Sequence, residues 1–240
     1  MSKIRAITFD FWGTLFRDAN LDERHRARVG ALAEIAGVSP EAADEALQTA
    51  YKEFFRTHVE EKRTLDQHDA VSLTTQLLGT SLAPAAAAEL ARRYAEAIIE
   101  HPAFPIEGAL AAVEAAAARV PVGLISDSGI SPGSSLTVLL ENHGFRPHFR
   151  ALTFSDEMKV AKPQPVMFTH TAAQLGVAPD EILHIGDLEP TDIAGILGVG
   201  GTGALIAAVN DKYYETTQAQ YRFRTWDEFI VQLDALLELA

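Results

Sequence analysis

Short apolar runs recur along the chain, and each stops at a polar residue or a turn signal. They cover residues 4–9, 121–125, 149–154, 182–185 and 204–209. Apolar runs of four to eight residues, bounded in this way and rich in β-branched residues, are typical of buried β-strands. We therefore predict a strand at each of the five, with the run at 149–154 the weakest.

Helical patterns separate these strands. Apolar residues at helix spacing, or stretches rich in Ala, indicate helices at residues 106–120, 134–143, 166–176 and 191–197. Strands that alternate with helices predict an α/β fold, a Rossmann-like parallel sheet with helices on both faces. In such sheets ligands bind at the carboxyl ends of the strands.

The stretch from residue 17 to residue 100 breaks this alternation, because it is helical almost throughout. A helical block inserted after the first strand indicates a separate small domain, and the segment HPAFP at 101–105 is the expected return linker. We predict a core made of residues 1–16 and 101–240 with an inserted α-helical cap at 17–100. The candidate cap helices lie near residues 22–36, 40–59, 66–78 and 84–99.

Composition narrows the classes of function. Lys and Arg number 20 against 33 Asp and Glu, which gives a net charge of −13 and disfavours nucleic-acid binding. The same charge opposes a small anionic substrate, so a phosphate site needs a local cation or metal. The chain has no Cys, which excludes disulfides and thiolate chemistry. It shows no signal-peptide pattern and no run as long as a membrane span. We expect a cytoplasmic protein with a small-molecule substrate and no membrane partner, and leave a homodimer open.

Four short segments place reactive side chains at the ends of predicted strands or before a helix. ITFDFWGTL contains Asp10, VGLISDS contains Ser126, and EMKVAKP contains Lys162 ahead of a proline. The fourth segment, LHIGDLEPTD, contains Asp187 and Asp192 after a strand.

These side chains are the parts of a site for phosphoryl transfer. A carboxylate such as Asp10 can act as a covalent nucleophile, and Asp187 offers an oxygen ligand of the kind Mg²⁺ prefers. Ser126 can donate a hydrogen bond to a phosphate oxygen. Lys162 supplies a compact positive charge where the phosphoryl group gains negative charge, with Lys159 as the alternative lysine.

The four segments resemble the four motifs of the haloacid dehalogenase superfamily, in the same order and on the same kinds of elements. The resemblance extends from residue 4 to about residue 200, and the helical insertion is similar to the cap that this superfamily carries between its first and second motifs. It implies a hydrolase with Asp10 as the nucleophile. It also implies that Mg²⁺ is bound by Asp10, by the backbone carbonyl of Trp12 and by Asp187, with Asp192 as a further metal-site or supporting carboxylate.

The resemblance implies a substrate site as well. Ser126 and Lys162 would hold the phosphoryl oxygens, and Lys162 would also steady the nucleophile. Gly13, Thr14 and Asp127 complete the expected substrate-binding set. The cap would close over the substrate and exclude water during the first step.

One position departs from the phosphatases of this superfamily. They carry an acid–base Asp two residues after the nucleophile, and Trp12 stands there instead. General acid–base help is worth about 10²–10⁴-fold in rate. Either the enzyme favours leaving groups that depart unprotonated, such as acyl or aryl phosphates, or Asp127 replaces the missing acid.

An aromatic residue at this position is similar to the haloacid dehalogenases proper, which attack carbon and need no metal. Those enzymes lack the Gly–Asp pair that Gly186 and Asp187 form here, and carry Asn where Asp127 stands. They also need a cap arginine for the substrate carboxylate, and the candidates are Arg24, Arg26 and Arg28.

The sequence therefore predicts a Mg²⁺-dependent phosphatase, a phosphoric monoester or acyl phosphate hydrolase that acts on a small phosphorylated metabolite. The alternatives are a metal-independent 2-haloacid dehalogenase and a weakly active or inactive domain that binds a phosphorylated ligand or a protein. The segment GVGGTG at 198–203 follows a predicted helix and precedes a strand, so we interpret it as a turn and not as a dinucleotide site. We interpret His184 as a packed core residue.

Overall fold

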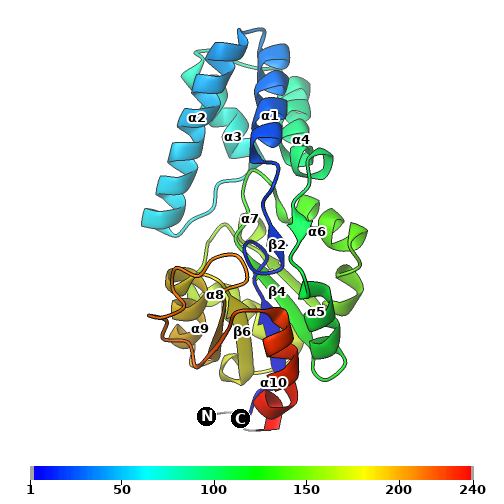
Figure 1. Cartoon of the computed structure of the whole chain (residues 1–240). Coiled ribbons are helices and arrows are strands. Elements are labelled where there is room, and N and C mark those ends of the chain that lie inside the picture. The colour runs from blue at the N-terminus through cyan, green and yellow to red at the C-terminus, as the bar shows by residue number, and fades with distance from the viewer. Residues whose placement is uncertain (1–2, 239–240) are drawn as a thin grey trace.

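The main sheet consists of parallel strands whose sequence order is interleaved (Figure 1). The computed structural model describes residues 3–238, so the two residues at each end of the predicted core lie outside it. All neighbouring strands of this sheet pair in parallel. In sheet order they are β5 (Ala151–Phe154), β4 (Val122–Ser126), β1 (Ala6–Phe9), β6 (Ile182–Gly186), β7 (Thr202–Ile206) and β8 (Tyr221–Phe223).

Helices cover both faces of this sheet because alternate strand residues point to opposite faces. Ile7 and Phe9 of β1 join a buried cluster with the helices of one face, whereas Ala6 joins the cluster of the other face. The first face carries α5 (Ala109–Ala117), α6 (Gly133–Asn142) and α10 (Trp226–Glu238). The second carries α8 (Pro165–Leu175) and α9 (Ala194–Gly198). This confirms the predicted Rossmann-like α/β core.

Short helical segments join several of these elements. They are the 3₁₀ turns Arg146–His148 and Pro179–Glu181, the helix α7 (Ser155–Met158) and the π-helical turn Glu189–Ile193 that leads into α9. The predicted turn at 198–203 is confirmed, since α9 ends at Gly198 and β7 begins at Thr202. The strand expected at 204–209 therefore begins and ends earlier than its apolar run suggests.

The end of the chain contains two elements that the sequence analysis did not predict. β8 has three residues and lies at the edge of the sheet, too short for a clear alternation pattern. Helix α10 does carry a helix-spaced apolar stripe of Trp226, Phe229, Leu233 and Leu236, all buried against the sheet. The periodicity was therefore present in the sequence for α10, and absent for β8.

Four helices form a second layer beyond the carboxyl ends of the strands (Figure 1), and we call residues 21–100 the helical unit. Local signals set their ends: Ser39 caps α2 with Pro40 at its first position, and Asp66 and Asp69 form a capping box on α3. The unit has a buried apolar cluster of its own. Its elements are α1 (Leu21–Ala36), α2 (Pro40–Arg56), the π-helical segment Thr57–Glu61, α3 (Gln67–Leu77) and α4 (Pro84–Glu100).

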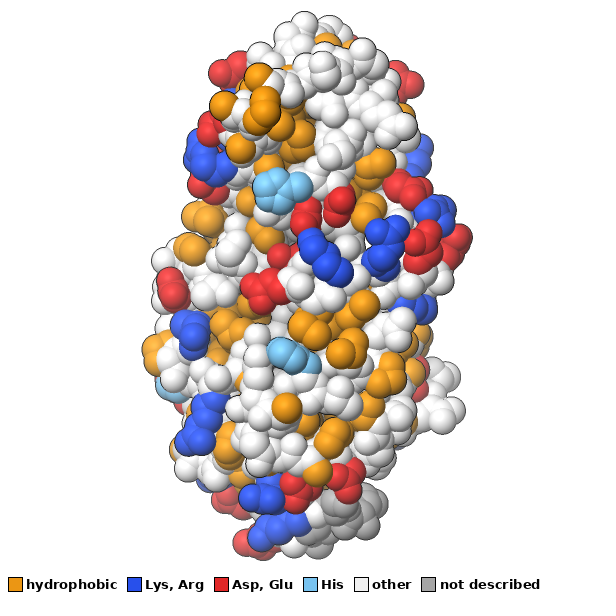
Figure 2. Space-filling model, turned by 180° about the vertical axis from the view of Figure 1, so that it is seen from behind, with side chains coloured by type: hydrophobic (Ala, Val, Ile, Leu, Met, Phe, Trp, Pro, Cys, Tyr) orange, Lys and Arg blue, Asp and Glu red, His pale blue; other side chains and the backbone are white. Residues whose placement is uncertain are grey.

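Two chain crossings, together with backbone and side-chain contacts, join the helical unit to the core. The crossings pair as a small antiparallel ribbon, β2 (Phe16–Arg17) with β3 (Phe104–Pro105), so part of the expected linker HPAFP is a strand. Ala161 N donates to the carbonyl of Lys62 at 2.9 Å, and Lys159 pairs with Asp66. Figure 2 shows acidic and basic side chains side by side at mid-height on the rear face. Within residues 3–238, no helix is long and apolar enough to cross a membrane.

Candidate active site

The strand order brings three reactive side chains to one edge of the sheet. β1 lies between β4 and β6, and Phe9 is in register with Leu124 on one side and Ile185 on the other. Asp10 follows β1, Ser126 ends β4 and Asp187 follows β6. Because parallel strands end at the same edge, residues more than a hundred positions apart in the chain become neighbours there.

Lys162 lies at the centre of this group. Its Nζ is 2.6 Å from Asp10 Oδ1 and 2.6 Å from Asp192 Oδ1, and it donates to the carbonyl of Ile125 at 3.1 Å. The side chain is 2% exposed. Burial alone would lower the pKa of Lys162, but the charges of Asp10 and Asp192 outweigh it and raise that pKa. The ammonium group therefore stays charged with its three donor hydrogens bound.

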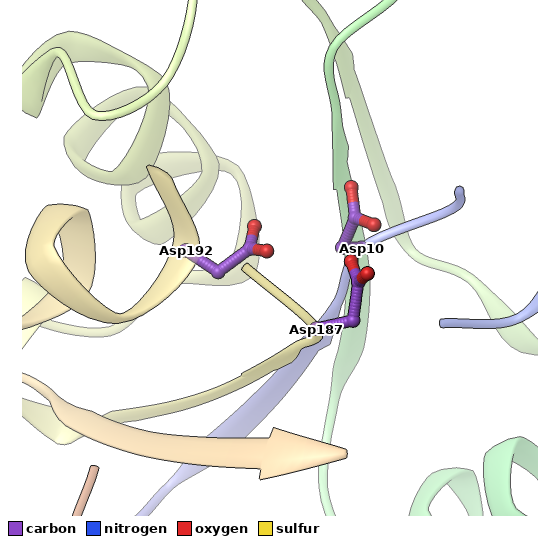
Figure 3. A group of neighbouring side chains, drawn as sticks. All are labelled: Asp10, Asp187 and Asp192. Atoms are coloured by element: carbon purple, nitrogen blue, oxygen red, sulfur yellow. The ribbon is translucent and has the colours of Figure 1, made fainter. Parts of the chain in front are cut away.

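Three buried carboxylates surround this lysine, and one oxygen of each of Asp10, Asp187 and Asp192 lies within 4.8 Å of the others. Figure 3 shows the three carboxylates gathered in one place, with Asp10 after β1 and both Asp187 and Asp192 from the segment that follows β6. Both oxygens of Asp192 are engaged: Oδ1 lies 3.3 Å from His184 Nε2 in addition to its contact with Lys162, and Oδ2 accepts from Leu188 N at 3.0 Å. Asp192 is thereby fixed as the anchor of Lys162.

Asp187 differs from Asp192 in its bonding. Its Oδ2 accepts from Asn210 Nδ2 at 2.9 Å, whereas its buried Oδ1 has no hydrogen-bond partner among the described residues. Burial raises the pKa of Asp187 to about 6, and the charge of Asp192 adds to this rise. Burial also raises the pKa of Asp10, which the charge of Lys162 only partly offsets.

Negative charge therefore exceeds positive charge in this site. One lysine faces three carboxylates, and burial lowers the pKa of His184, so the imidazole adds no positive charge near neutral pH. An unpartnered buried carboxylate oxygen beside a second carboxylate fits a small divalent cation with oxygen ligands. Asp10 and Asp187 are the residues that could hold it.

Two glycines let the loops of the site approach closely. A Cβ on Gly186 would lie 2.2 Å from Asp192 Cγ, so any larger residue would push that carboxylate away from Lys162. A Cβ on Gly13 would lie 2.6 Å from Asp187 Oδ2, and Gly13 also has a φ of +71°. Gly186 of the fourth segment and Gly13 of the first segment are therefore required because a larger side chain would clash with Asp192 or Asp187.

A cavity of about 580 Å³ lies between the helical unit and the core. This size fits a small ligand. Trp12 and Asp127 line it from the core, and Arg28, Tyr51 and Phe54 line it from the helical unit. Aromatic rings from both the core and the helical unit thus contribute to the wall.

The three arginines that the sequence analysis named lie in different settings. Arg24 and Arg28 are buried and line the cavity, whereas Arg26 is exposed and pairs with Glu23 at 2.9 Å. Arg24 pairs with Asp18. Arg28 donates to the carbonyl of Tyr94 at 3.0 Å and to Ser131 Oγ at 2.8 Å, and it has no carboxylate partner within residues 3–238.

The sequence matches a known protein family over most of its length. A family model for haloacid dehalogenase-like hydrolases matches residues 4–200. The chain belongs to this family. The hydrolase is 34% identical over 98 residues to pyrimidine 5'-nucleotidase YjjG of Escherichia coli (strain K12), which covers 40% of the chain and 42% of that protein. It is 38% identical over 52 residues to glyceraldehyde 3-phosphate phosphatase of Methanopyrus kandleri, 22% of each protein. The matched segments thus span less than half of these relatives.

Solved structures similar to the hydrolase include both phosphatases and dehalogenases. A phosphatase from Thermococcus onnurineus superimposes with a TM-score of 0.65 at 23% identity over 96% of the hydrolase and 98% of that chain. A 2-haloacid dehalogenase from Pseudomonas syringae pv. Tomato DC3000 gives 0.71 at 18% identity over 98% and 99%. These likenesses support the fold and do not choose between the two reactions.

The structure brings most of the predicted site residues of the hydrolase together. Ser126 is fully buried and its Oγ donates to the carbonyl of Asp127 at 3.1 Å. Thr14 is buried too, and its Oγ1 has no hydrogen-bond partner among the described residues. Lys159, the alternative lysine, is exposed and pairs with Asp66 of the helical unit.

Two contributors had no interpretable signal in the sequence. His184 is buried, as predicted for a packed residue, but its ring also lies 2.9 Å from Thr8 Oγ1 and links that hydroxyl to Asp192. His58, in the π-helical segment of the helical unit, has its Nε2 3.7 Å from Asp127 Oδ2. A single His, in a strand as for His184 or in a helical segment as for His58, carries no spacing pattern that could have indicated either contact.

Proposed function

We propose that this hydrolase is a Mg²⁺-dependent phosphatase that acts on a small phosphorylated metabolite through a covalent Asp10 intermediate. The unpartnered buried Oδ1 of Asp187 beside Asp10 carries this proposal, because a site without a cation would leave it unsatisfied. The two curated relatives, a pyrimidine 5'-nucleotidase and a glyceraldehyde 3-phosphate phosphatase by name, favour a phosphorylated small molecule.

Each residue has a role in this proposal. Asp10 attacks the phosphorus while Lys162, held by Asp192, stabilises the negative charge on the phosphoryl oxygens. Ser126 turns its hydroxyl from the Asp127 carbonyl to one of these oxygens. Asp10, Asp187 and the Trp12 carbonyl would hold Mg²⁺. When bound, Mg²⁺ supplies positive charge that screens the carboxylates from the incoming phosphate.

The helical unit is the cap in this proposal. It forms one wall of the cavity, so a substrate in the cavity is enclosed between the unit and the core. Enclosure excludes water from Asp10 until the leaving group has departed. We place the reaction in the cytoplasm, as the sequence analysis expects.

The test is phosphate release from acetyl phosphate and from p-nitrophenyl phosphate, with Mg²⁺ or with EDTA, beside an Asp10→Asn variant. Release that requires Mg²⁺ and is lost in the variant supports the proposal. Release that persists in EDTA, or in Asp10→Asn, refutes it. Stabilisation of the fold by inorganic phosphate without any turnover would favour the binding domain instead.

A second candidate function, a 2-haloacid dehalogenase, is favoured by Arg28. A buried guanidinium without a carboxylate partner could bind the carboxylate of a haloacid in the cavity. Chloride release from 2-chloropropionate in EDTA, lost in Arg28→Gln, would support this candidate. The absence of chloride release alongside phosphate release would exclude it.

A further inference from the structure

The proposed phosphatase lacks a proton donor at position 12, because the Trp12 indole cannot serve as an acid–base group. An alkyl group, or an aryl group as basic as phenolate, would depart slowly without one, whereas a weakly basic aryl group such as nitrophenolate leaves unprotonated. The acidic and imidazole groups that line the large cavity are Asp18, Asp22, His25 and Asp127. Asp18 pairs with Arg24, and His25 with Asp44, so their polar atoms are already engaged.

Asp127 differs from the other three in its link to the nucleophile. Its Oδ1 accepts a hydrogen bond from the backbone N of Lys162 at 3.0 Å, and the Nζ of that lysine contacts Asp10. It also shares the large cavity with Trp12, the residue in the usual acid's position. The carboxyl group of Asp127 is therefore fixed on one side by the residue that steadies Asp10, and Asp127 lines the large cavity.

The other oxygen of Asp127 faces the helical unit. His58 Nε2 lies 3.7 Å from Oδ2, and both side chains are mostly buried, with 31% and 20% of their surfaces exposed. The two residues share a second, smaller cavity of about 340 Å³, lined also by Phe54 and Leu65. An inward movement of less than 1 Å would bring this pair to the hydrogen-bond distance of about 2.6–3.2 Å that proton transfer requires.

We propose that Asp127 is the acid–base residue of this hydrolase and that His58 of the helical unit is its positioning partner. This inference rests on the proposed phosphatase function. Because the two residues come from different units, the acid–base group is complete only when the helical unit lies on the core. The movement that closes the helical unit over the substrate therefore also places His58 against Asp127 for proton transfer.

The proton balance is complete without a further reactant. Protonated Asp127 gives its proton to the leaving oxygen as the bond from that oxygen to phosphorus breaks and the bond from Asp10 to phosphorus forms. The resulting carboxylate is stabilised by His58. In the second step Asp127 takes a proton from water as the water oxygen bonds to phosphorus and the bond to Asp10 breaks, which regenerates the starting state.

The charges around Asp127 agree with this role. Burial raises its pKa, and the charges of Lys162 and His58 oppose the rise while that of Asp192 adds to it. On its own segment His58 is accompanied by Glu60 and Glu61, which point to Arg56. The pair thus holds a carboxyl group that can both give and take a proton.

The test compares leaving groups in one active site. Wild type, Asp127→Asn and His58→Gln are assayed with Mg²⁺ on acetyl phosphate and on the matched pair p-nitrophenyl phosphate and phenyl phosphate. Acetate and nitrophenolate leave without a proton, whereas phenolate leaves slowly unless it is protonated. His68→Gln, in α3 of the helical unit, is the matched control because His68 lines neither cavity.

We expect kcat/KM on phenyl phosphate, which reports the reaction up to departure of the leaving group, to fall by about 10²–10⁴-fold in Asp127→Asn, with a smaller fall in His58→Gln. On acetyl phosphate kcat/KM should fall by less than about tenfold, because no acid is needed for that leaving group. Turnover at saturation does not make this comparison, because Asp127 also assists water attack on the Asp10 intermediate, which all three substrates share. The double variant should lose no more than Asp127→Asn alone, since His58 acts through Asp127. His68→Gln should match the wild type on all three substrates.

Equal losses of kcat/KM on acetyl phosphate and phenyl phosphate would overturn the inference, because they would indicate a structural role. Additive losses in the double variant would overturn the pairing. If Asp127→Asn does not fold, the ratio of the two aryl phosphates in His58→Gln still decides: an unchanged ratio refutes the role of the pair. Failure of the wild type on acetyl phosphate is a separate result, since it would refute the phosphatase function itself.

Discussion

Replacing Asp187 by Asn should stabilise the metal-free protein, although Asp187 belongs to the proposed active site. The carboxylate is 5% exposed, and burial raises its pKa from 3.8 to about 6. At about 1.4 kcal/mol for each tenfold change in an equilibrium, ionised Asp187 costs the fold about 3 kcal/mol above about pH 7. Asn has nearly the same shape and no charge, so the variant avoids this cost and can still bond Asn210.

The effect should depend on pH with a defined sign. The folded-state pKa is raised, so the favourable contribution of protonated Asp187 is fully present below about pH 3.8 and is lost as the pH rises through about 6. The variant should therefore be more stable than the wild type by about 3 kcal/mol near pH 7.5 and by about half that near pH 5.

Urea unfolding in EDTA at both pH values measures this difference. Asp211→Asn removes an exposed carboxylate nearby and serves as the control, with no stabilisation expected. Added Mg²⁺ should stabilise the wild type, by about 2.7 kcal/mol at a hundredfold excess over Kd, and should stabilise Asp187→Asn far less. A variant that is no more stable than the wild type in EDTA at either pH would refute the argument from buried charge, and equal Mg²⁺ stabilisation of both proteins would refute the assigned ligand.

Two further substitutions test the lysine and the glycine of the site. Lys162→Met leaves Asp10 and Asp192 buried without their cation, so we expect a loss of about 3–5 kcal/mol in the free energy of unfolding, measured by urea, together with loss of acetyl phosphate turnover. Lys159→Met, which removes an exposed lysine, should cost less than about 1 kcal/mol. Gly186→Ala forces a Cβ against Asp192 and should cost about 1–3 kcal/mol. An alanine variant as stable and active as the wild type would show that the loop relaxes freely.

Much of the core could be predicted from local patterns. The strands at β1, β4 and β6 are short apolar runs whose neighbours along the chain mark their ends, and α2 and α3 begin at capping residues. These signals act between residues a few positions apart, so they can be recognised without a tertiary structure. The strand-end positions of Asp10, Ser126 and Asp187 followed from the same patterns, together with the rule that parallel strands end at one edge.

The remaining features depend on distances between segments far apart in the chain. Lys159 and Lys162 lie three residues apart, and only packing places Lys162 against Asp10 and Lys159 against Asp66. The contact between His58 of the helical unit and Asp127 of the core depends on how the helical unit packs on the core.

The hydrogen bonds inside the site could not be predicted from the sequence either. Asp187 and Asp192 lie five residues apart in one segment, and only the fold leaves Asp187 Oδ1 without a partner among the described residues while both oxygens of Asp192 are bound. The sequence by itself determined which segments become strands and helices and which reactive residues end them, because those choices are local. The tertiary structure decided which of these residues touch, because that depends on how the segments pack.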